Sequence, residues 1–315
     1  MQKKEAYLCR VRIVFYGTPE FAATTLVKIH ESGFNIVGVV TAPDKPAGRG
    51  QKLQSSAVKI AAEQLNLPIA QPSNLKSETF AQQLSEWNPS IGVVIAFRML
   101  PEKVWNFPSL GTVNLHASLL PDYRGAAPIQ HAIINGEIQT GISTFFLKHE
   151  IDTGDIIDQD SVPITEEMNG GMLHDVLMEK GSDLMVVTLN KIAINGAQTP
   201  TIPQINKGLS NKMAPKISRE FCHLNTNQGV LEIHNKIRGL SPYPSAWIES
   251  QWGDMKIFES EIISNNETVP QGVHIYEKEL RLGLAAGYLR VHSLQIPGKA
   301  RMRATDFING FSKKI

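Results

Sequence analysis

Residues 113–128 and 151–155 contain the side chains of this chain that are best suited to acyl-transfer chemistry. They include the amide of Asn114, the imidazole of His116 and the isolated carboxylate of Asp152. An amide N–H can stabilise the negative charge that develops on a carbonyl oxygen, and imidazole and carboxylate groups can move protons. This combination of residue types predicts acyl transfer.

A predicted strand places two of these side chains. The apolar run at 91–96 and the residues leading into Asn114 predict buried parallel strands. Alternate side chains of a strand share a face, so Asn114, His116 and Ser118 should point the same way at the carboxyl end of their strand. Open α/β sheets bind their ligands at that end.

The same residues also have purely structural explanations. A lone strand histidine can be satisfied within a core, and Asp152 and Asp155 can cap their tight turn through hydrogen bonds to the backbone. The stiff glycine- and proline-containing segments 118–121 and 124–128 favour a shaped ligand-binding loop. Gly17, after the first predicted strand, lacks the other two glycines of a dinucleotide fingerprint, so no NAD site is expected.

Strands and helices alternate through the first two thirds of the chain. Thr18 is a candidate N-cap and Pro19 the first residue of a helix. Alternation of this kind predicts βαβ units, so the expected fold is α/β with a Rossmann-like parallel sheet. The predicted strands cover 12–16, 35–41, 91–96 and 156–164, and the predicted helices cover 19–31, 55–65, 79–87 and 171–194.

The pattern changes after residue 195. Residues 195–215 are rich in Pro, Gly, Asn and Lys, which is typical of a linker. A short helix over 230–238, ended by Gly239, is followed by short strands and turns that predict a small OB-like β-barrel. The strands are expected at 246–249, 255–258, 272–276, 282–284 and 288–292. The predicted organisation is a catalytic domain over 1–195, a linker over 196–213 and an OB-like domain over 214–315.

Composition limits the class of protein. The 315 residues are 42% hydrophobic and carry a formal net charge of +1, which fits a globular protein and excludes a strongly basic nucleic-acid binder without excluding a local basic face. Two distant cysteines form neither a disulfide framework nor a zinc motif. No signal peptide or membrane span is recognisable, so a cytoplasmic location without membrane contact is expected. Residues 1–10 are expected to be an extension without a role.

Taken together, the motifs resemble those of the folate-dependent formyltransferases, and the resemblance covers nearly the whole chain. They are Asn-x-His-x-Ser-Leu-Leu-Pro from 114, Tyr-Arg-Gly-Ala-Ala-Pro-Ile from 123 and Asp-Thr-Gly-Asp from 152. Residues 13–21, 43–50 and 232–244 look like the members that act on a charged tRNA. The chain departs from the family at Phe97-Arg98, where many members have Tyr-Gly, and at Ser245, where glycine is common.

The resemblance implies roles for particular residues. Asn114, His116 and Asp152 fall on the catalytic positions, with Asp152 keeping His116 charged and handling the proton. The formyl donor would be 10-formyltetrahydrofolate, and no metal is required. Its expected contacts are Ser118, Leu119, Leu120 and Pro121, with Phe97, Met99 and Leu100 as an apolar wall for the pterin ring.

The resemblance also implies a tRNA acceptor, the methionine carried by initiator tRNA. Residues 43–53 would be the insertion that enters the acceptor arm, although a polar loop can equally be only solvated surface. The expected tRNA contacts are Lys45, Arg49 and Lys52 in this loop, and Lys212 and Arg301 further on.

Three other functions stay open from the sequence. The same site could formylate an amino sugar nucleotide or another small amine, but such an acceptor needs neither a basic loop nor a second domain. A formyltetrahydrofolate hydrolase is a further alternative. The chain could also be an RNA-binding protein with an idle formyltransferase fold, against which the complete set of Asn114, His116 and Asp152 argues.

Overall fold

The computed structural model describes residues 11–47, 52–204, 212–263, 267 and 269–311, and its contacts divide the chain into two compact units. Unit 1 comprises Met1–Arg124, Gly141–Val162 and Asp175–Lys212. Unit 2 comprises Gly125–Thr140, Pro163–His174 and Met213–Ile315. The units are therefore interleaved along the chain, and residues 175–212 belong to unit 1. The boundaries at 195 and 213 stay a prediction about which segments fold independently.

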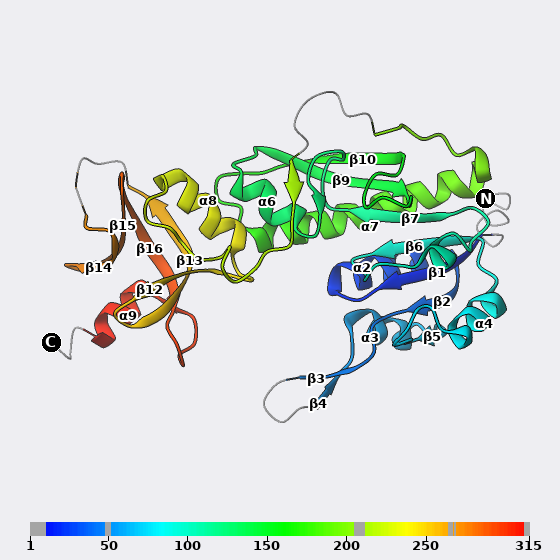
Figure 1. Ribbon diagram of the computed structural model, residues 1–315, viewed down its shortest axis with the longest axis horizontal. Helices are drawn as coiled ribbons and strands as arrows, with labels where there is room; N and C mark the ends of the chain where they lie inside the picture. The colour runs from blue at the N-terminus through cyan, green and yellow to red at the C-terminus, as the bar shows by residue number, and fades with distance from the viewer. Residues whose placement is uncertain (1–10, 48–51, 205–211, 264–266, 268, 312–315) are drawn as a thin grey trace. The chain divides into compact units, whose positions relative to one another are not determined.

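Unit 1 is built on a seven-stranded sheet of order β10-β9-β7-β6-β1-β2-β5 (Figure 1). Strands β1, β2, β6 and β7 pair in parallel, as predicted, and β5 adds a further parallel strand beside β2. Strand β1 lies between β2 and β6, so the strand order reverses beside it, which is where open α/β sheets bind ligands. The bounds are β1 Arg12–Gly17, β2 Asn35–Val40, β5 Ile69–Ala70, β6 Ile91–Ile95, β7 Thr112–His116, β9 Gln139–Phe146 and β10 Ile156–Pro163.

The central strands are apolar because both faces of the sheet are covered. Every residue of β6 is buried. Gly38 of β2 leaves room for the ring of Trp87, which a Cβ at Gly38 would meet at 2.2 Å. The helices of this part are α2 Glu20–Glu31, α3 Ala57–Gln64, α4 Glu78–Trp87, α5 Glu102–Trp105 and α7 Gly170–Asn195, followed by the 3₁₀ turn Gly196–Gln198.

Four details differ from the sequence prediction. The N-cap of α2 is Pro19 rather than Thr18. Strand β9, which was not predicted, runs antiparallel to β7. Residues 199–204, expected in a linker, include Ile202, which forms an antiparallel bridge with Ile156 of β10. The expected polar loop at 43–53 contains a hairpin, β3 Lys45–Ala47 and β4 Lys52–Gln54, which projects from the sheet (Figure 1).

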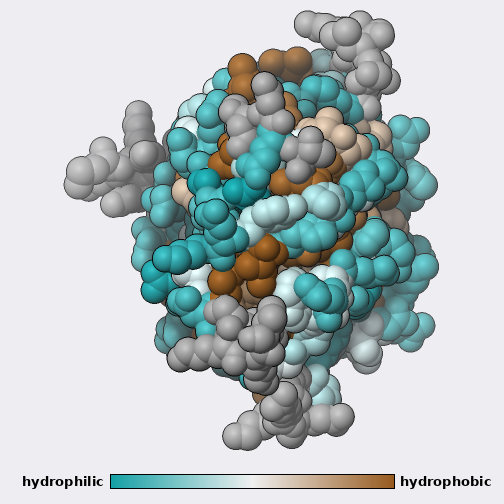
Figure 2. Space-filling model, turned by 90° about the vertical axis from the view of Figure 1, so that its left-hand side faces the viewer, coloured by the Kyte–Doolittle hydropathy of each residue, from teal (hydrophilic) through white to brown (hydrophobic). Residues whose placement is uncertain are grey.

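Unit 2 contains a curled antiparallel sheet of order β12-β13-β16-β15-β14, with β17 pairing with β16 (Figure 1). Among the described residues β12 and β14 are the two ends of this path, so the sheet forms a half-barrel, consistent with the predicted OB-like domain. The face shown in Figure 2 is mostly hydrophilic, with hydrophobic patches exposed between the hydrophilic residues. The strands are β12 Ala246–Ser250, β13 Gly253–Ile262, β14 Gly272–Tyr276, β15 Glu279–Leu284, β16 Gly287–Gln295 and β17 Met302–Arg303.

Helices α6 (Pro128–Ile134) and α8 (Val230–Leu240) pack against each other in unit 2. Helix α8 continues through Gly239, which was expected to end it. Glycine at this position serves the packing of α8 on α6 rather than the end of the helix, because a Cβ at Gly239 would lie 2.8 Å from Cγ1 of Ile134. The remaining elements are the two-stranded sheet of β8 (Arg124–Gly125) and β11 (Met213–Ala214), and the helix α9 (Ala304–Phe311).

Two histidines of unit 2 make its stability depend on pH. Burial lowers the pKa of His131, partly offset by the hydrogen bond of its Nε2 to the Pro215 carbonyl. Burial and then the nearby charge of Arg238 lower the pKa of His234. Both rings are therefore neutral in the folded state at pH values where the unfolded chain protonates them. Their contribution is complete above the unfolded pKa of about 6.5, and it is lost as the pH falls from that value through the lower pKa of the folded state.

We expect the urea midpoint of unfolding to fall between pH 7.5 and pH 5.5, and the double variant His131→Gln, His234→Gln to show a smaller fall. The exposed His149 is the matched control, and His149→Gln should keep the full acid sensitivity. An unchanged acid sensitivity in the double variant would contradict this explanation.

Candidate functional site

The candidate site begins at the carboxyl end of β7, beside the carboxyl end of β6. Asn114 and His116 are alternate residues of β7 and share a face, as predicted. Ser118 lies beyond the end of the strand. Because β6 and β7 are parallel, the segment that starts at Ala96 leaves the sheet at the same edge as His116.

The imidazole of His116 lies between a backbone carbonyl and a carboxylate. Its Nε2 lies 2.8 Å from the carbonyl oxygen of Tyr123, and its Nδ1 lies 3.8 Å from Oδ2 of Asp152. The carbonyl can only accept, so Nε2 carries a proton in this arrangement. Nδ1 is consequently the nitrogen that can gain or lose a proton, and it faces Asp152 across a gap that one water can bridge.

Asp152 does not reach His116 by strand order alone. Strand β9 is antiparallel to β7, and its last residue, Phe146, pairs with Val113 rather than with His116. The loop between β9 and β10 has to turn to bring Asp152 to the histidine. Only 8% of the His116 side chain and 11% of the Asp152 side chain are exposed, so their interaction is poorly screened by water.

The side chain of Asn114 is available to a ligand. Asn114 is half-buried, and among the described residues no group hydrogen-bonds its amide. By contrast, Thr112 on the same face donates its hydroxyl proton to the carbonyl of Trp105 at 2.6 Å. An uncommitted amide beside a histidine can donate to a carbonyl oxygen that binds there.

Three non-glycine residues around the site have left-handed backbone conformations. They are Ala96 (φ 45°), Tyr123 (φ 60°) and Asp152 (φ 55°). Such conformations cost roughly 1–3 kcal/mol each and occur preferentially at functional sites. At Tyr123 the conformation presents the carbonyl to His116. The sequence motif contains Tyr123, but a functional backbone carbonyl has no residue-type signal by which it could have been predicted.

The seven predicted folate contacts divide into buried and accessible residues. Ser118, Leu120 and Leu100 are buried, and the Ser118 hydroxyl donates to the Asp122 carbonyl at 2.6 Å. Leu100 belongs to the apolar cluster of the sheet that includes Tyr16 and Val14. The accessible residues are Phe97, Leu119 and Pro121, which are half-buried, and Met99, which is 76% exposed.

Arg98, which departs from the family pattern, supports a neighbouring loop. Its guanidinium donates to the carbonyls of Pro72 and Ser73 and lies 5.7 Å from the centre of the Phe97 ring. The ring of Tyr16 lies 6.0 Å from that of Phe97, and its hydroxyl is buried and has no hydrogen-bond partner among the described residues. Burial raises the pKa of Tyr16, so the phenol is protonated at neutral pH.

The hairpin that was predicted to contact tRNA is anchored at its base. Asp44 accepts from Lys59 at 2.5 Å and from Gln71 at 2.8 Å, and these hydrogen bonds lower its pKa. Lys45 is exposed on β3. Arg49 lies outside the described residues, and Lys52 is described only as part of β4.

The two other predicted tRNA contacts are already engaged within their own units. Lys212 is exposed, and its Nζ lies 5.9 Å from the centre of the Tyr123 ring. Arg301 pairs with Glu259 at 2.5 Å and donates to Ser293 at 2.7 Å. In the described part of unit 2, Lys216, Lys256 and Lys299 are basic residues without an ion pair within 4.0 Å.

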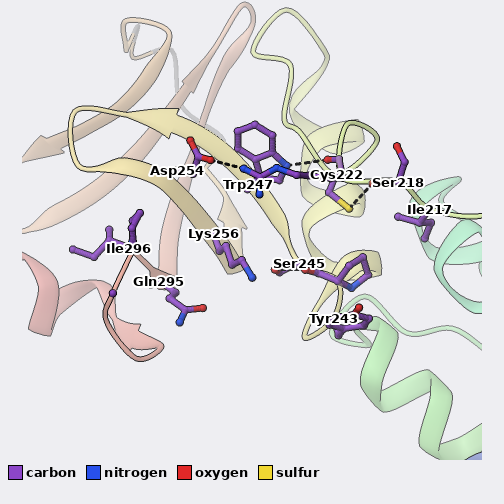
Figure 3. A pocket seen from close by; sticks show the side chains of 14 residues that line it. Ile217, Ser218, Cys222, Tyr243, Ser245, Trp247, Asp254, Lys256, Gln295 and Ile296 are labelled. Atoms are coloured by element: carbon purple, nitrogen blue, oxygen red, sulfur yellow. Dashed lines mark hydrogen bonds and ion pairs between the residues drawn. The ribbon is translucent and has the colours of Figure 1, made fainter. Parts of the chain in front are cut away.

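Unit 2 also contains a hollow of about 550 Å³ (Figure 3). Lys256 and the highly exposed Tyr243 lie on its rim, and Trp247 forms part of its wall. One face of the indole is covered by Arg219, which itself pairs with Asp254. The buried thiol of Cys222 also lines the hollow, and burial raises its pKa, so it is not a reactive thiolate.

Comparison with known proteins supports the same interpretation of both units. Residues 10–189 match the family model described as formyl transferase, and residues 216–312 match that of the formyl transferase C-terminal domain. The methionyl-tRNA formyltransferase of Bacteroides fragilis is 48% identical over 310 residues, which cover 96% of this chain and 95% of that protein. The methionyl-tRNA formyltransferase of Bacteroides thetaiotaomicron is 49% identical over 310 residues and 96% of each chain.

Solved structures with low sequence identity share the fold. HypX from Aquifex aeolicus, in complex with tetrahydrofolic acid, has a TM-score of 0.66 at 14% identity, over 96% of this chain and 48% of that chain. An N-formyltransferase from Helicobacter canadensis has a TM-score of 0.62 at 20% identity, over 89% of this chain and 98% of that chain. With both family models matched and near-half identity to relatives over almost its full length, this chain belongs to the formyl transferase family.

Proposed function

We propose that this chain transfers the formyl group of 10-formyltetrahydrofolate to the amino group of the methionine carried by initiator tRNA. The observation that carries the proposal is the placement of His116 between the Tyr123 carbonyl and the Asp152 carboxylate, with the uncommitted Asn114 amide on the same face. The near-half identity to methionyl-tRNA formyltransferases identifies the acceptor. Translation initiation places this activity in the cytoplasm.

The chemistry exchanges one C–N bond for another. The amino nitrogen of methionine forms a bond to the formyl carbon, and the bond from that carbon to N10 of the folate breaks. The attacking amine loses a proton and N10 gains one, so the products are formylmethionyl-tRNA and tetrahydrofolate. The protein has to stabilise negative charge on the formyl oxygen and to move this proton.

The side chains of the site fit these two tasks. Asn114 donates an amide N–H to the formyl oxygen. Because Nε2 of His116 is held by Tyr123, its Nδ1–H is the donor that can add a charge-assisted hydrogen bond. The Asp152 carboxylate, 3.8 Å from Nδ1, counters positive charge on the ring and accepts the proton that the amine loses.

The formyl donor fits the segments beside β6 and β7. The accessible residues Phe97, Met99, Leu119 and Pro121 are the candidates for its contacts. Ser118, Leu100 and Leu120 support these contacts from the core. Tyr16, whose buried hydroxyl lacks a partner among the described residues, gives this apolar region a hydrogen-bonding atom that suits a pterin ring.

We expect each of the variants Asn114→Ala, His116→Ala and Asp152→Ala to lower the single-turnover rate of formylation by about a hundredfold or more, because loss of one such donor costs roughly 10²–10³ in rate. The thermal midpoint should change little for Asn114, whose amide has no internal partner to lose. Rates would be measured with labelled formyl donor and charged initiator tRNA.

The exposed His149 and the half-buried, ion-paired Asp160 provide controls, and His149→Ala and Asp160→Asn should formylate at the wild-type rate. Near-normal turnover by a folded His116→Ala protein would overturn the mechanism. A wild-type preference for an amino sugar nucleotide over charged tRNA would overturn the proposed acceptor.

The hairpin is expected to contribute to tRNA binding. Replacing the exposed Lys45 by Ala should weaken the binding of charged initiator tRNA and lower the slope of log K against log salt by about one unit, as for one lost phosphate contact. Donor binding should not change. The matched control is Lys76→Ala, since Lys76 is exposed elsewhere in unit 1. Equal effects of the two variants would mean that the hairpin lysine acts only through the overall charge.

In unit 2 the unpaired lysines should matter more than the paired arginine. The double variant Lys216→Ala, Lys299→Ala is expected to lower the salt slope by about two units for initiator and elongator tRNA alike, because phosphate contacts position without reading sequence. Arg301→Ala should have a smaller effect, since its guanidinium is held by Glu259 and Ser293. A larger effect of Arg301→Ala would show that Arg301 leaves these partners to bind RNA.

A further inference from the structure

Gln204 makes four side-chain hydrogen bonds that join two parts of the catalytic site. Its Nε2 lies 3.0 Å from the carbonyl oxygen of Asp152 and 2.7 Å from that of Gly154. Its Oε1 accepts from Nε and Nη2 of Arg124 at 3.1 and 2.6 Å. A guanidinium only donates and a carbonyl only accepts, so only one orientation of the amide satisfies all four contacts.

Gln204 is itself firmly placed. The backbone two residues earlier is bonded in both directions, since N–H of Ile202 donates to Ile156 at 2.7 Å and N–H of Ile156 donates to Ile202 at 2.8 Å. These contacts, and those of Gln204, all lie within unit 1. The segment that looked like a linker in the sequence therefore carries a fixed side chain into the site.

The loop that Gln204 holds needs support from outside. Asp152 has a left-handed backbone conformation, which is unfavourable for a non-glycine residue. Gly154 packs so closely that a Cβ there would lie 1.6 Å from the Phe146 carbonyl oxygen. The loop is also held by the bond from the Thr153 hydroxyl to the Glu150 carbonyl at 3.0 Å and, at its end, by the bond from the Phe146 N–H to the Asp155 carbonyl at 3.2 Å. The side-chain amide of Gln204 donates to the carbonyl oxygens of Asp152 and Gly154, which lie on either side of Thr153.

Arg124, which donates to the Gln204 side chain, connects these hydrogen bonds to His116. Arg124 directly follows Tyr123, whose carbonyl accepts from Nε2 of His116. Gln204 thus links the backbone that orients His116 to the backbone that carries Asp152. The 3.8 Å separation between Nδ1 of His116 and Oδ2 of Asp152 depends on both.

We propose that Gln204 is a positioning residue for the formyl transfer, which sets the approach of the Asp152 carboxylate to His116. This inference rests on the proposed function for its activity readout. Gln204 touches neither substrate nor reacting atoms, and it acts through Asp152. A displacement of a catalytic group by about 1 Å can cost about a hundredfold in rate, so the effect of losing Gln204 is measurable.

The test is a double-mutant cycle between Gln204→Ala and Asp152→Asn, read as single-turnover rates and as KM for donor and acceptor. In the wild-type background we expect Gln204→Ala to lower kcat by about tenfold to a hundredfold with KM nearly unchanged. In the Asp152→Asn background the same substitution should have almost no further effect, because the carboxylate that it positions is gone.

Two further variants separate positioning from folding. Gln204→Glu keeps an acceptor for Arg124 but has no N–H for the two carbonyls, so it should lose as much kcat as Gln204→Ala. Gln198 is exposed in the same segment, and Gln198→Ala should behave as the wild type. Equal losses from Gln204→Ala in both backgrounds, or a kcat within twofold of wild type, would overturn the proposal.

Hydrogen exchange gives a readout that does not need activity. The amides of residues 152–155 should exchange faster in Gln204→Ala than in Gln198→Ala, and equal exchange would contradict the proposed contact. If the wild type failed to formylate charged initiator tRNA, the proposed function would fall, while the exchange result would still decide whether Gln204 holds the loop.

Discussion

The hydrogen bond between His116 and the Tyr123 carbonyl is the constraint on which the rest of the site depends. By holding Nε2, it leaves Nδ1 as the one nitrogen that can exchange a proton, and Nδ1 faces Asp152. The conformation at Tyr123 is costly, and its N–H is in turn bonded to the carbonyl of Lys212 at 2.5 Å. A left-handed backbone conformation, held by a bond from a distant segment, therefore fixes the orientation of this ring.

The described residues that follow α7, 199–204 and Lys212, support the candidate site and are not only a spacer. Gln204 supports the loop of Asp152, and the carbonyl of Lys212 supports Tyr123. Both catalytic side chains are thus held by backbone whose own partners come from far along the chain. Such long-range support suits a site in which charges must be presented with little reorganisation during the reaction.

Electrostatics in unit 2 bear on how an RNA acceptor is bound. The arginines Arg219, Arg281, Arg290 and Arg301 are paired with carboxylates, so much of the positive charge is neutralised locally. This agrees with a chain whose formal net charge is only +1. The described surface of unit 2 therefore offers an RNA a few lysines without an ion pair rather than a general basic field.

Residue types and local periodicity were enough to predict the α/β fold, a second OB-like β domain and the shared face of Asn114 and His116, because alternation along a strand is a local property. They could not show β9 as an antiparallel strand, the helical continuation through Gly239, or the hydrogen bonds of Gln204. Each of these depends on which distant groups meet: the register of β9 against β7, the close approach of α6, and two carbonyls that accept one amide. The residue types that we propose for catalysis can be read from the sequence, whereas the distances between them arise only from tertiary packing.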